Sequence, residues 1–375
     1  MRLGILSHTE HCLIDGVWNG LSPTVREIDH VSSCFDEVVH AACGYPKLEG
    51  YQLQPYNATN VRFVPLRPSG GARLLDKLGI VLSAPANLAA MLRVARECDV
   101  VQVRLPTGMG IYLLPALRLA GISNAWAKYA GNWIQERPPL SYAFQRWWLG
   151  RLFNGPVTIN GNWPGMESHF LAFENPCLTE HEVTLARTQC RARKAELPVR
   201  FCFVGRLERA KGIERIVQAL GFVPAKERID AVHFVGDGAE RSHWEKVARD
   251  TGVRCVFHGA LGRDALSQIY ADSHYLLLPS DSEGFPKVIA EAAAFGVIPV
   301  VSAVSAIPQY VSSANGFLWQ PDTSFSDWFS SQDFFNVPKI EAMSVEIAKL
   351  ANLFTYERYC ARLQSEIISR LGAGI

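Results

Sequence analysis

The 375-residue sequence predicts an α/β protein built from two doubly wound domains. The length is large for one domain and comfortable for two. Short apolar runs of strand length alternate with helical patterns along the chain, which favours parallel sheets covered by helices. A content of 48% hydrophobic and 19% charged residues fits a well-packed globular protein.

The stretch from residue 275 to 301 shows this pattern most clearly. An apolar run over 275–279 predicts a buried strand, and turn-forming residues follow over 280–284. Pro286 suits the first helical position, and Gly296 ends the helix before the next strand. The start of this helix therefore lies at the carboxyl end of a strand, where open parallel sheets bind ligands.

The start of this helix is a candidate anion site. The backbone N–H groups of Phe285, Lys287 and Val288 precede the first helical hydrogen bonds and favour a phosphate. Glu283 and Glu291 frame the site, and eight residues of helix span roughly 12 Å. That length fits a sugar joined through two phosphates to a ribose. An ordinary crossover helix with two surface glutamates is the alternative.

The segment Glu283-Gly-Phe-Pro-Lys-Val-Ile-Ala-Glu291 resembles the E-x7-E motif of retaining glycosyltransferases of family 4, which have the GT-B architecture. The resemblance is strong from Phe201 to Trp319 and diffuse before that. It implies a GT-B fold, with two Rossmann-like doubly wound domains facing each other across a cleft. It also implies a nucleotide-diphosphate sugar as donor, front-face attack by an acceptor hydroxyl, no cofactor and no metal.

A second motif follows a predicted strand over residues 198–205. Arg206-Leu-Glu-Arg-Ala-Lys211-Gly212 resembles the G-R-L…K-G segment of that family, whose arginine and lysine hold the donor diphosphate. Cations aimed at the leaving phosphate stabilise the charge that develops as the sugar–phosphate bond breaks. The turn that begins at Gly236 resembles the family's G-D-G-P-E turn, and the backbone over 258–260 matches a stretch that contacts the base.

The resemblance thus implies two sets of site residues in the C-terminal half. Glu283, Arg206 and Lys211 take part in catalysis. The donor is bound by Glu291 at the ribose hydroxyls and by Gly284, Phe285, Pro286, Lys287, Val288, Gly205, Gly236, His258, Gly259 and Ala260.

The N-terminal half begins with a predicted strand over residues 3–7 and a loop that leads to a helix over 22–34. Gly16 in this loop is a candidate for acceptor binding, although family members carry a double glycine there and this sequence does not. His8 and His11 are potential metal ligands, but no carboxylate or cysteine completes a typical metal-site spacing. Loop histidines without a metal are the alternative.

Three more acceptor candidates follow predicted strands. Arg104 ends one of them and suits a phosphate or an acidic sugar. A strand-end arginine paired with a surface acid is the alternative. Asn132 and Trp133 follow another strand, where an indole face stacks on a sugar ring and an amide both donates and accepts. A packed loop is equally consistent. The other predicted elements here are strands over 37–42, 61–66, 99–103, 125–129 and 155–160, and helices over 73–97, interrupted near Pro85, and over 164–170.

Residues 137–151 combine basic and aromatic side chains without an acid. Three arginines, two adjacent tryptophans, Tyr142 and Phe144 lie in this segment. Such a helix suits peripheral contact with an anionic membrane. A helix that packs its tryptophans on the sheet is the alternative.

Bulk properties limit the function classes. A net charge of +1 gives no indication of wholesale nucleic-acid binding, and no nucleic-acid partner is expected. Nine cysteines without a C-x-x-C pair favour reduced thiols and a cytoplasmic protein, with the inner face of the cell membrane as a possible site of contact. No signal peptide and no transmembrane run is expected. The predicted domains are 1–190 for the acceptor and 197–354 for the donor, joined by a basic linker, and a helix over 355–375 packs back on the first domain.

The resemblance to family 4 thus implies a retaining glycosyltransferase. It moves a sugar from a UDP- or GDP-sugar to a hydroxyl of a glycan or lipid-linked acceptor, in bacterial cell-surface polysaccharide or glycolipid synthesis. Two alternatives stay open. One is another GT-B enzyme, a nucleotide-sugar epimerase or a phosphorylase. The other is a non-catalytic subunit that binds a sugar nucleotide.

Overall fold

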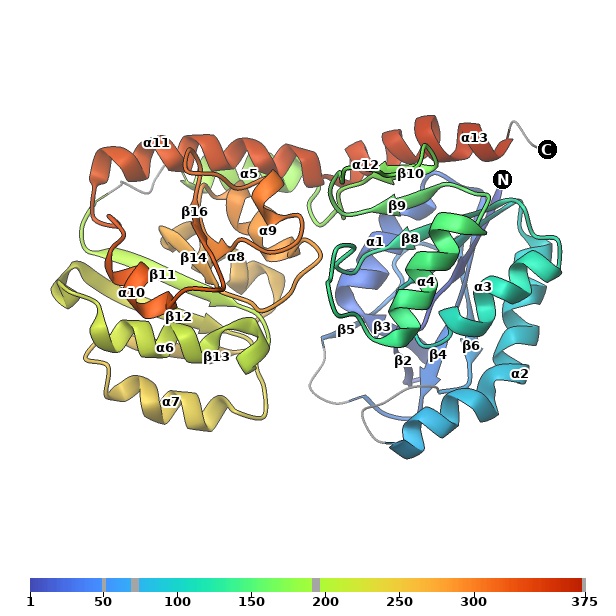
Figure 1. The fold of residues 1–375 in the computed structure, drawn as a ribbon, viewed down its shortest axis with the longest axis horizontal. Coiled ribbons are helices and arrows are strands. Elements are labelled where there is room, and N and C mark those ends of the chain that lie inside the picture. The colour runs from blue at the N-terminus through green and yellow to red at the C-terminus, as the bar shows by residue number, and fades with distance from the viewer. Residues whose placement is uncertain (49–51, 69–73, 191–195, 373–375) are drawn as a thin grey trace. The chain divides into compact units, whose positions relative to one another are not determined.

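The computed structural model describes residues 1–48, 52–68, 74–190 and 196–372. They form two units of nearly equal size (Figure 1). Unit 1 contains Met1–Asn175 and Tyr356–Ile375, and unit 2 contains Pro176–Thr355. The boundary thus precedes helix α5 (Glu180–Cys190), whereas the sequence placed the end of the first domain at residue 190. Arg191, Arg193 and Lys194 of the predicted linker lie outside the described residues.

Unit 1 is organised on a sheet of ten described strands, in the order β10-β9-β8-β7-β1-β4-β2-β3-β5, with β6 paired to β4. All neighbours from β10 to β2 in this order pair in parallel. The last two pairs, β2 with β3 and β3 with β5, are antiparallel. The strands are β1 (Arg2–Leu6), β2 (His11–Ile14), β3 (Val17–Leu21), β4 (Glu37–Tyr45), β5 (Leu53–Pro55), β6 (Val61–Leu66), β7 (Val100–Leu105), β8 (Ala125–Tyr129), β9 (Val157–Ile159) and β10 (Phe170–Ala172).

Helices cover both faces of this sheet. Apolar residues of α2, α3 and α4 pack on one face, and those of α1 and the C-terminal helices pack on the other. Leu363 and Ile367 are completely buried against Leu3 and Ile5 of β1, which places the C-terminal segment in unit 1, as predicted. The helices are α1 (Ser22–Ser32), α2 (Leu74–Glu97), α3 (Gly110–Leu119), α4 (Leu140–Arg151), α12 (Tyr356–Arg362), η5 (Leu363–Ile368) and α13 (Ser369–Gly372).

Unit 2 has a parallel sheet of six described strands in the order β13-β12-β11-β14-β15-β16. The four central strands of this sheet are mostly buried on both faces, as expected of a doubly wound sheet. The strands are β11 (Val199–Val204), β12 (Ile229–Val235), β13 (Cys255–Gly259), β14 (Tyr275–Leu278), β15 (Ile298–Ser302) and β16 (Phe317–Trp319). The other helices are η1 (Arg209–Lys211), α6 (Ile213–Phe222), η2 (Lys226–Arg228), α7 (Arg241–Arg249), α8 (Arg263–Asp272), α9 (Lys287–Ala294), η3 (Ile307–Gln309), α10 (Phe325–Ser330), α11 (Val337–Ala348) and η4 (Lys349–Phe354).

Three local predictions in unit 1 are wrong. Helix α2 continues through Pro85, because a proline inside a helix removes one hydrogen bond and need not end it. The loop after β1 contains the hairpin β2–β3, whose turn is Asp15-Gly16. No helix forms over 164–170, where Gly165 has a positive φ of 77° and β10 begins at Phe170.

Candidate functional site

The candidate donor site of unit 2 lies where the order of the strands reverses. Strands β11 and β14 are neighbours in the sheet, and the chain leaves them toward opposite edges. Open α/β sheets bind ligands at such a switch point, outside the carboxyl ends of the strands. The segment after β11 carries Arg206 and Lys211, and the segment after β14 carries Glu283. The topology therefore brings together two motifs that are about 70 residues apart in sequence.

The two segments are joined by several direct contacts. Lys211 Nζ lies 2.6 Å from Glu283 Oε1, in an ion pair whose carboxylate side chain is 10% exposed. The backbone N–H of Asp281 donates to the carbonyl of Ala210 at 2.9 Å. Arg215 of α6 donates to the Pro279 carbonyl at 3.0 Å and pairs with Asp281 at 2.5 Å. Sequence reasoning missed Arg215, because a single arginine in a helix carries no local signal of this role.

Gly212 allows the two segments to approach each other. It adopts a left-handed conformation with a φ of 87°, and an added Cβ would lie 2.3 Å from the carbonyl oxygen of Pro279. Both the conformation and the close approach require glycine.

We therefore expect Gly212→Ala to lower the free energy of unfolding of unit 2 by about 2 kcal/mol. Urea unfolding followed by circular dichroism measures this loss. Gly221→Ala in α6 is the matched control, because a Cβ at Gly221 meets nothing within 4 Å. Equal stability of the two variants would contradict the assignment.

The glycines and Arg206 lie around the same strand ends. Gly205 N–H donates to Val235 at 3.0 Å, and Gly236 N–H donates to Gly259 at 2.8 Å. A Cβ at Gly236 would lie 1.9 Å from the Gly205 carbonyl oxygen, so this position accepts only glycine. The side chain of Arg206 is 66% exposed and contacts Glu208 at 3.1 Å, which leaves it accessible to an anion.

Helix α9 begins one residue later than predicted. Pro286 is its N-cap residue and Lys287 its first residue, followed by Val288. The side chain of Phe285 is buried and stacks on Phe354 at 4.7 Å, so only its backbone is available to a donor. Gly284 separates this anchored residue from Glu283. Burial of Phe285 fixes the start of α9 against the core of unit 2.

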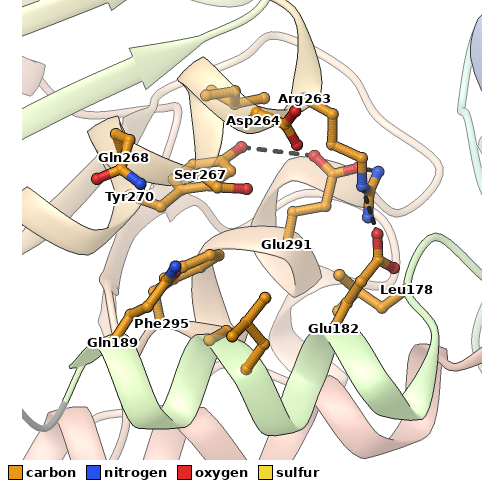
Figure 2. A pocket seen from close by; sticks show the side chains of 13 residues that line it. Leu178, Glu182, Gln189, Arg263, Asp264, Ser267, Gln268, Tyr270, Glu291 and Phe295 are labelled. Atoms are coloured by element: carbon orange, nitrogen blue, oxygen red, sulfur yellow. Dashed lines mark hydrogen bonds and ion pairs between the residues drawn. The ribbon is translucent and has the colours of Figure 1, made fainter.

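Glu291 lies in the wall of a cavity of about 310 Å³ between α5, α8 and α9 (Figure 2). Its carboxylate accepts from the Tyr270 hydroxyl at 3.5 Å and lies 4.0 Å from Arg263. Burial, and then the charge of Glu291, raise the pKa of Tyr270, so its hydroxyl stays protonated and donates. Arg263 also pairs with Glu182 at 2.7 Å. Sequence reasoning missed this wall, although the Thr179-x-x-Glu182 capping box signals the start of α5.

His258, Gly259 and Ala260 lie at the carboxyl end of β13. The imidazole of His258 hydrogen-bonds that of His233 on β12, with 2.8 Å between Nε2 and Nδ1. Burial lowers the pKa of both rings. The side chain of His258 is therefore held by its neighbour, and the backbone of these residues remains the candidate contact for a base.

In unit 1, Arg104 belongs to a buried ion cluster. Arg104 and Lys128 contact the same carboxylate, Glu27 of α1, at 2.9 and 2.5 Å. The side chains of Glu27, Arg104 and Lys128 are 5%, 14% and 8% exposed. Arg104 also donates to Gln102 at 2.8 Å. The structure thus places Arg104 in a pair with an acid, but this acid is buried and does not lie at the surface as the alternative expected.

A chain of buried hydrogen bonds lies beside this cluster. The carbonyl of Thr9 can only accept, so Nδ1 of His11 donates to it at 3.0 Å and Nε2 accepts from the Tyr56 hydroxyl at 2.8 Å. Tyr56 in turn accepts from His40 Nδ1 at 2.6 Å, and His40 Nε2 accepts from Ser7 at 2.9 Å. Both rings are fully buried and neutral in this arrangement. His11 is thus a hydrogen-bonding residue of the interior.

This arrangement predicts a loss of stability in acid. Burial, with a contribution from Arg104, lowers the pKa of His11 to about 4. The unfolded chain takes up a proton below about pH 6.5 and the native state does not, so stability falls as the pH falls. Between pH 7.5 and 5.5, His11→Gln should lose about 1.4 kcal/mol less than the parent protein. Urea unfolding at the two pH values measures this difference, and the exposed His243→Gln is the control. A pH dependence of stability in His11→Gln equal to that of the parent protein would contradict this prediction.

The remaining acceptor candidates lie in turns of unit 1. Gly16 is at the exposed tip of the β2–β3 hairpin, separated from the end of β1 by all of β2. Asn132 caps its own turn by accepting from the N–H of Ile134 at 3.1 Å. Trp133 is half-buried against Tyr129 and Phe170 and lines a second cavity of about 310 Å³.

The described residues contain neither a metal-binding cluster nor a membrane-spanning helix. No group of three or more His, Cys, Asp or Glu side chains in these residues has an arrangement that could hold a metal ion. None of the described helices has the length and hydropathy of a membrane span.

Residues 191–327 match the family model of the glycosyl transferases group 1. The match includes every candidate donor residue from Gly205 to Glu291. A segment of 123 residues is 36% identical to the sulfoquinovosyl transferase SQD2 of Arabidopsis thaliana and covers 32% of this chain and 23% of that protein. The matched segment therefore corresponds to about a quarter of the length of this relative.

Solved structures resemble the whole chain. The sucrose-phosphate synthase of Thermosynechococcus elongatus superposes with a TM-score of 0.72 at 15% identity, over 100% of both chains. Anabaena HepE, in complex with UDP and glucose, superposes with a TM-score of 0.68 at 16% identity, also over 100% of both chains. At these identities the likeness shows the fold. It confirms the prediction of two Rossmann-like α/β domains of the GT-B type.

Proposed function

We propose that this protein is a retaining glycosyltransferase of family 4 that uses a nucleotide-diphosphate sugar and needs no metal or cofactor. The observation that carries the proposal is the pairing of Lys211 with Glu283 beside the start of α9, at the switch point of unit 2. This geometry provides a cation, a carboxylate and the start of a helix in one place. The match of residues 191–327 to group 1 glycosyl transferases supports the same reaction class.

Four side chains of unit 2 have roles in the proposed reaction. Lys211 and the exposed Arg206 bind the diphosphate and stabilise the charge that grows on the leaving phosphate. Glu283 contacts the sugar hydroxyls, and Glu291 accepts from the ribose hydroxyls. The acceptor hydroxyl attacks from the face that the nucleotide leaves, which retains the configuration at the anomeric carbon.

A nucleotide screen tests this proposal. UDP, GDP, ADP and CMP are added separately, and the shift in melting temperature is measured, because a ligand that binds only the native state stabilises it. We expect a shift with UDP or GDP, and HepE, which was solved with UDP and glucose, favours UDP. The shift should shrink in Lys211→Ala. No shift with any of the four nucleotides would contradict the proposed function.

We further propose a glycan or lipid-linked acceptor at the inner face of a bacterial membrane, in cell-surface polysaccharide or glycolipid synthesis. Helix α4 supports membrane contact, because Leu140 at its start is 89% exposed and Trp147 is 54% exposed. Arg137 and Arg151 are exposed near the two ends of the helix. Apolar and cationic groups on one helix suit an anionic interface.

Flotation with lipid vesicles tests this contact. The protein should float with vesicles that contain phosphatidylglycerol and remain below those of phosphatidylcholine alone, and added salt should weaken binding. Trp147→Ser should reduce flotation. Trp244 of α7 is buried, so Trp244→Ser does not change the surface and is unsuitable as a control. Leu185→Ser, at an exposed position of α5, is the matched control. Equal flotation of both variants would contradict a role for α4.

A further inference from the structure

Two thiols from opposite ends of the chain meet in unit 1. Cys34 follows helix α1, and Cys360 lies in α12, which packs against α1 (Figure 1). The Cys360 thiol donates to the carbonyl of His30, about one helical turn before Cys34, at 3.8 Å. Gln364, about one turn after Cys360, donates to the carbonyl of Cys34, so the two thiols lie near each other where α12 packs on α1. Both side chains are half-buried at the edge of the core that the C-terminal helices form with α1. Small oxidants can therefore reach them.

The contact between the thiols is held from both sides. The backbone N–H of Cys34 donates to Val31 at 3.0 Å, and Gln364 donates to the carbonyl of Cys34 at 3.2 Å. The ring of His30 stacks on Tyr356 with 4.0 Å between the centroids. These contacts fix α1 and α12 relative to each other. The two thiols are thus kept near each other by contacts on both helices.

The surroundings make the two thiols chemically different. Hydrogen bonds from Cys360, and then from Ser33 and Gln364, lower the pKa of the Cys34 thiol to about 6, although burial acts in the opposite sense. The carboxyl end of α1 also disfavours a negative charge there, so the thiolate depends on these hydrogen bonds. The hydrogen bond to Cys34, together with burial, raises the pKa of Cys360. Cys34 is therefore the nucleophile of the pair, and Cys360 is the resolving thiol.

We propose that Cys34 and Cys360 form a peroxide-sensitive dithiol, and that its oxidation joins α1 to α12 through a disulfide. The Cys34 thiolate attacks one oxygen of a hydroperoxide, which yields a sulfenic acid and releases the other oxygen as water or an alcohol after protonation. The sulfur of Cys360 then attacks the sulfur of Cys34, and the hydroxyl leaves as water with the proton of Cys360. Two thiols lose two electrons in total, and the hydroperoxide gains them.

The disulfide would tether the C-terminal segment with which the chain returns to unit 1. Tyr356 is the first residue of that segment, and Cys360 lies one helical turn further on. A bond from Cys360 to Cys34 closes a loop that contains all of unit 2. Such a loop restricts the unfolded chain strongly. Oxidation should therefore hold the C-terminal helices in place and slow their release from α1.

Thiol counting and peptide mapping test this proposal on the full-length protein. After one equivalent of hydrogen peroxide, the number of titratable thiols in the denatured protein should fall from nine to about seven. A peptide pair joined through Cys34 and Cys360 should appear in a non-reducing digest and disappear with dithiothreitol. Before oxidation, iodoacetamide at pH 7 should modify Cys34 about tenfold faster than Cys360. The oxidised protein should also unfold at a higher urea concentration.

Variants separate this pair from the other thiols. Cys34→Ser and Cys360→Ser should each abolish the linked peptides and the shift in the urea midpoint. Cys190→Ser, which removes a half-buried thiol of α5, should leave both unchanged. Peroxide that leaves nine thiols, or that converts Cys34 to a sulfinic acid without a linked peptide, would overturn the proposal. So would linked peptides that persist in Cys360→Ser.

Discussion

Replacement of Lys211 by alanine is expected to lower kcat by about 100-fold, or about 2.7 kcal/mol in activation free energy. The Lys211 ammonium lies 2.6 Å from Glu283, in a position set by η1 and by the tight approach at Gly212. A leaving phosphate at the start of α9 would gain most from this cation as its charge develops. Donor binding should weaken less than turnover, because the charge on the phosphate is largest in the transition state.

The measurement is the rate of nucleotide release from the donor sugar that the nucleotide screen identifies. Lys349→Ala is the matched control, since Lys349 also pairs with a glutamate, Glu346, at 2.6 Å, but its side chain is 65% exposed on the surface of unit 2. Circular dichroism and the melting temperature show that each variant folds. If Lys211→Ala keeps the turnover of Lys349→Ala, the phosphate does not lie beside Lys211 and the proposed chemistry is wrong.

The sequence predicted unit 2 in more detail than unit 1, because the elements around the site of unit 2 are encoded by residues close together in the chain. Strand β14, the turn after it and helix α9 are encoded by consecutive residues, from an apolar run through Pro286 to Gly296. Each boundary carries its own signal, so the candidate site could be assembled from short motifs. Parallel strand order then brings Lys211 to Glu283, which a doubly wound sheet makes predictable.

Unit 1 depends on contacts between distant parts of the chain. The ion cluster joins Glu27 of α1 to Arg104 and Lys128 on two neighbouring strands, and no local pattern connects these residues. The hairpin at Asp15-Gly16 did have a signal, because an Asp-Gly pair between apolar residues is typical of a tight hairpin turn. The same pair also lies after a strand end, a position that favours a ligand loop, and this second signal is the misleading one.

Glu27→Gln is expected to lower the free energy of unfolding of unit 1 by about 3 kcal/mol. The substitution keeps the shape of the side chain and removes the only charge that it carries. Arg104 and Lys128, 14% and 8% exposed, would then lie close together without the carboxylate between them. Repulsion and desolvation of the two cations act in the same direction. Urea unfolding, followed through a probe in unit 1, measures the loss.

A more exposed carboxylate in the same unit shows whether the loss in Glu27→Gln comes from burial of the charges or from the ion pairs alone. Glu37 also bridges two arginines, Arg2 at 2.7 Å and Arg62 at 3.2 Å, but its side chain is 31% exposed. Water screens those charges, so Glu37→Gln should cost less than about 1 kcal/mol. Addition of Lys128→Met to Glu27→Gln should restore part of the loss, because it leaves one buried cation instead of two. Equal losses in Glu27→Gln and Glu37→Gln would mean that water reaches the cluster and that Arg104 is open to an acceptor.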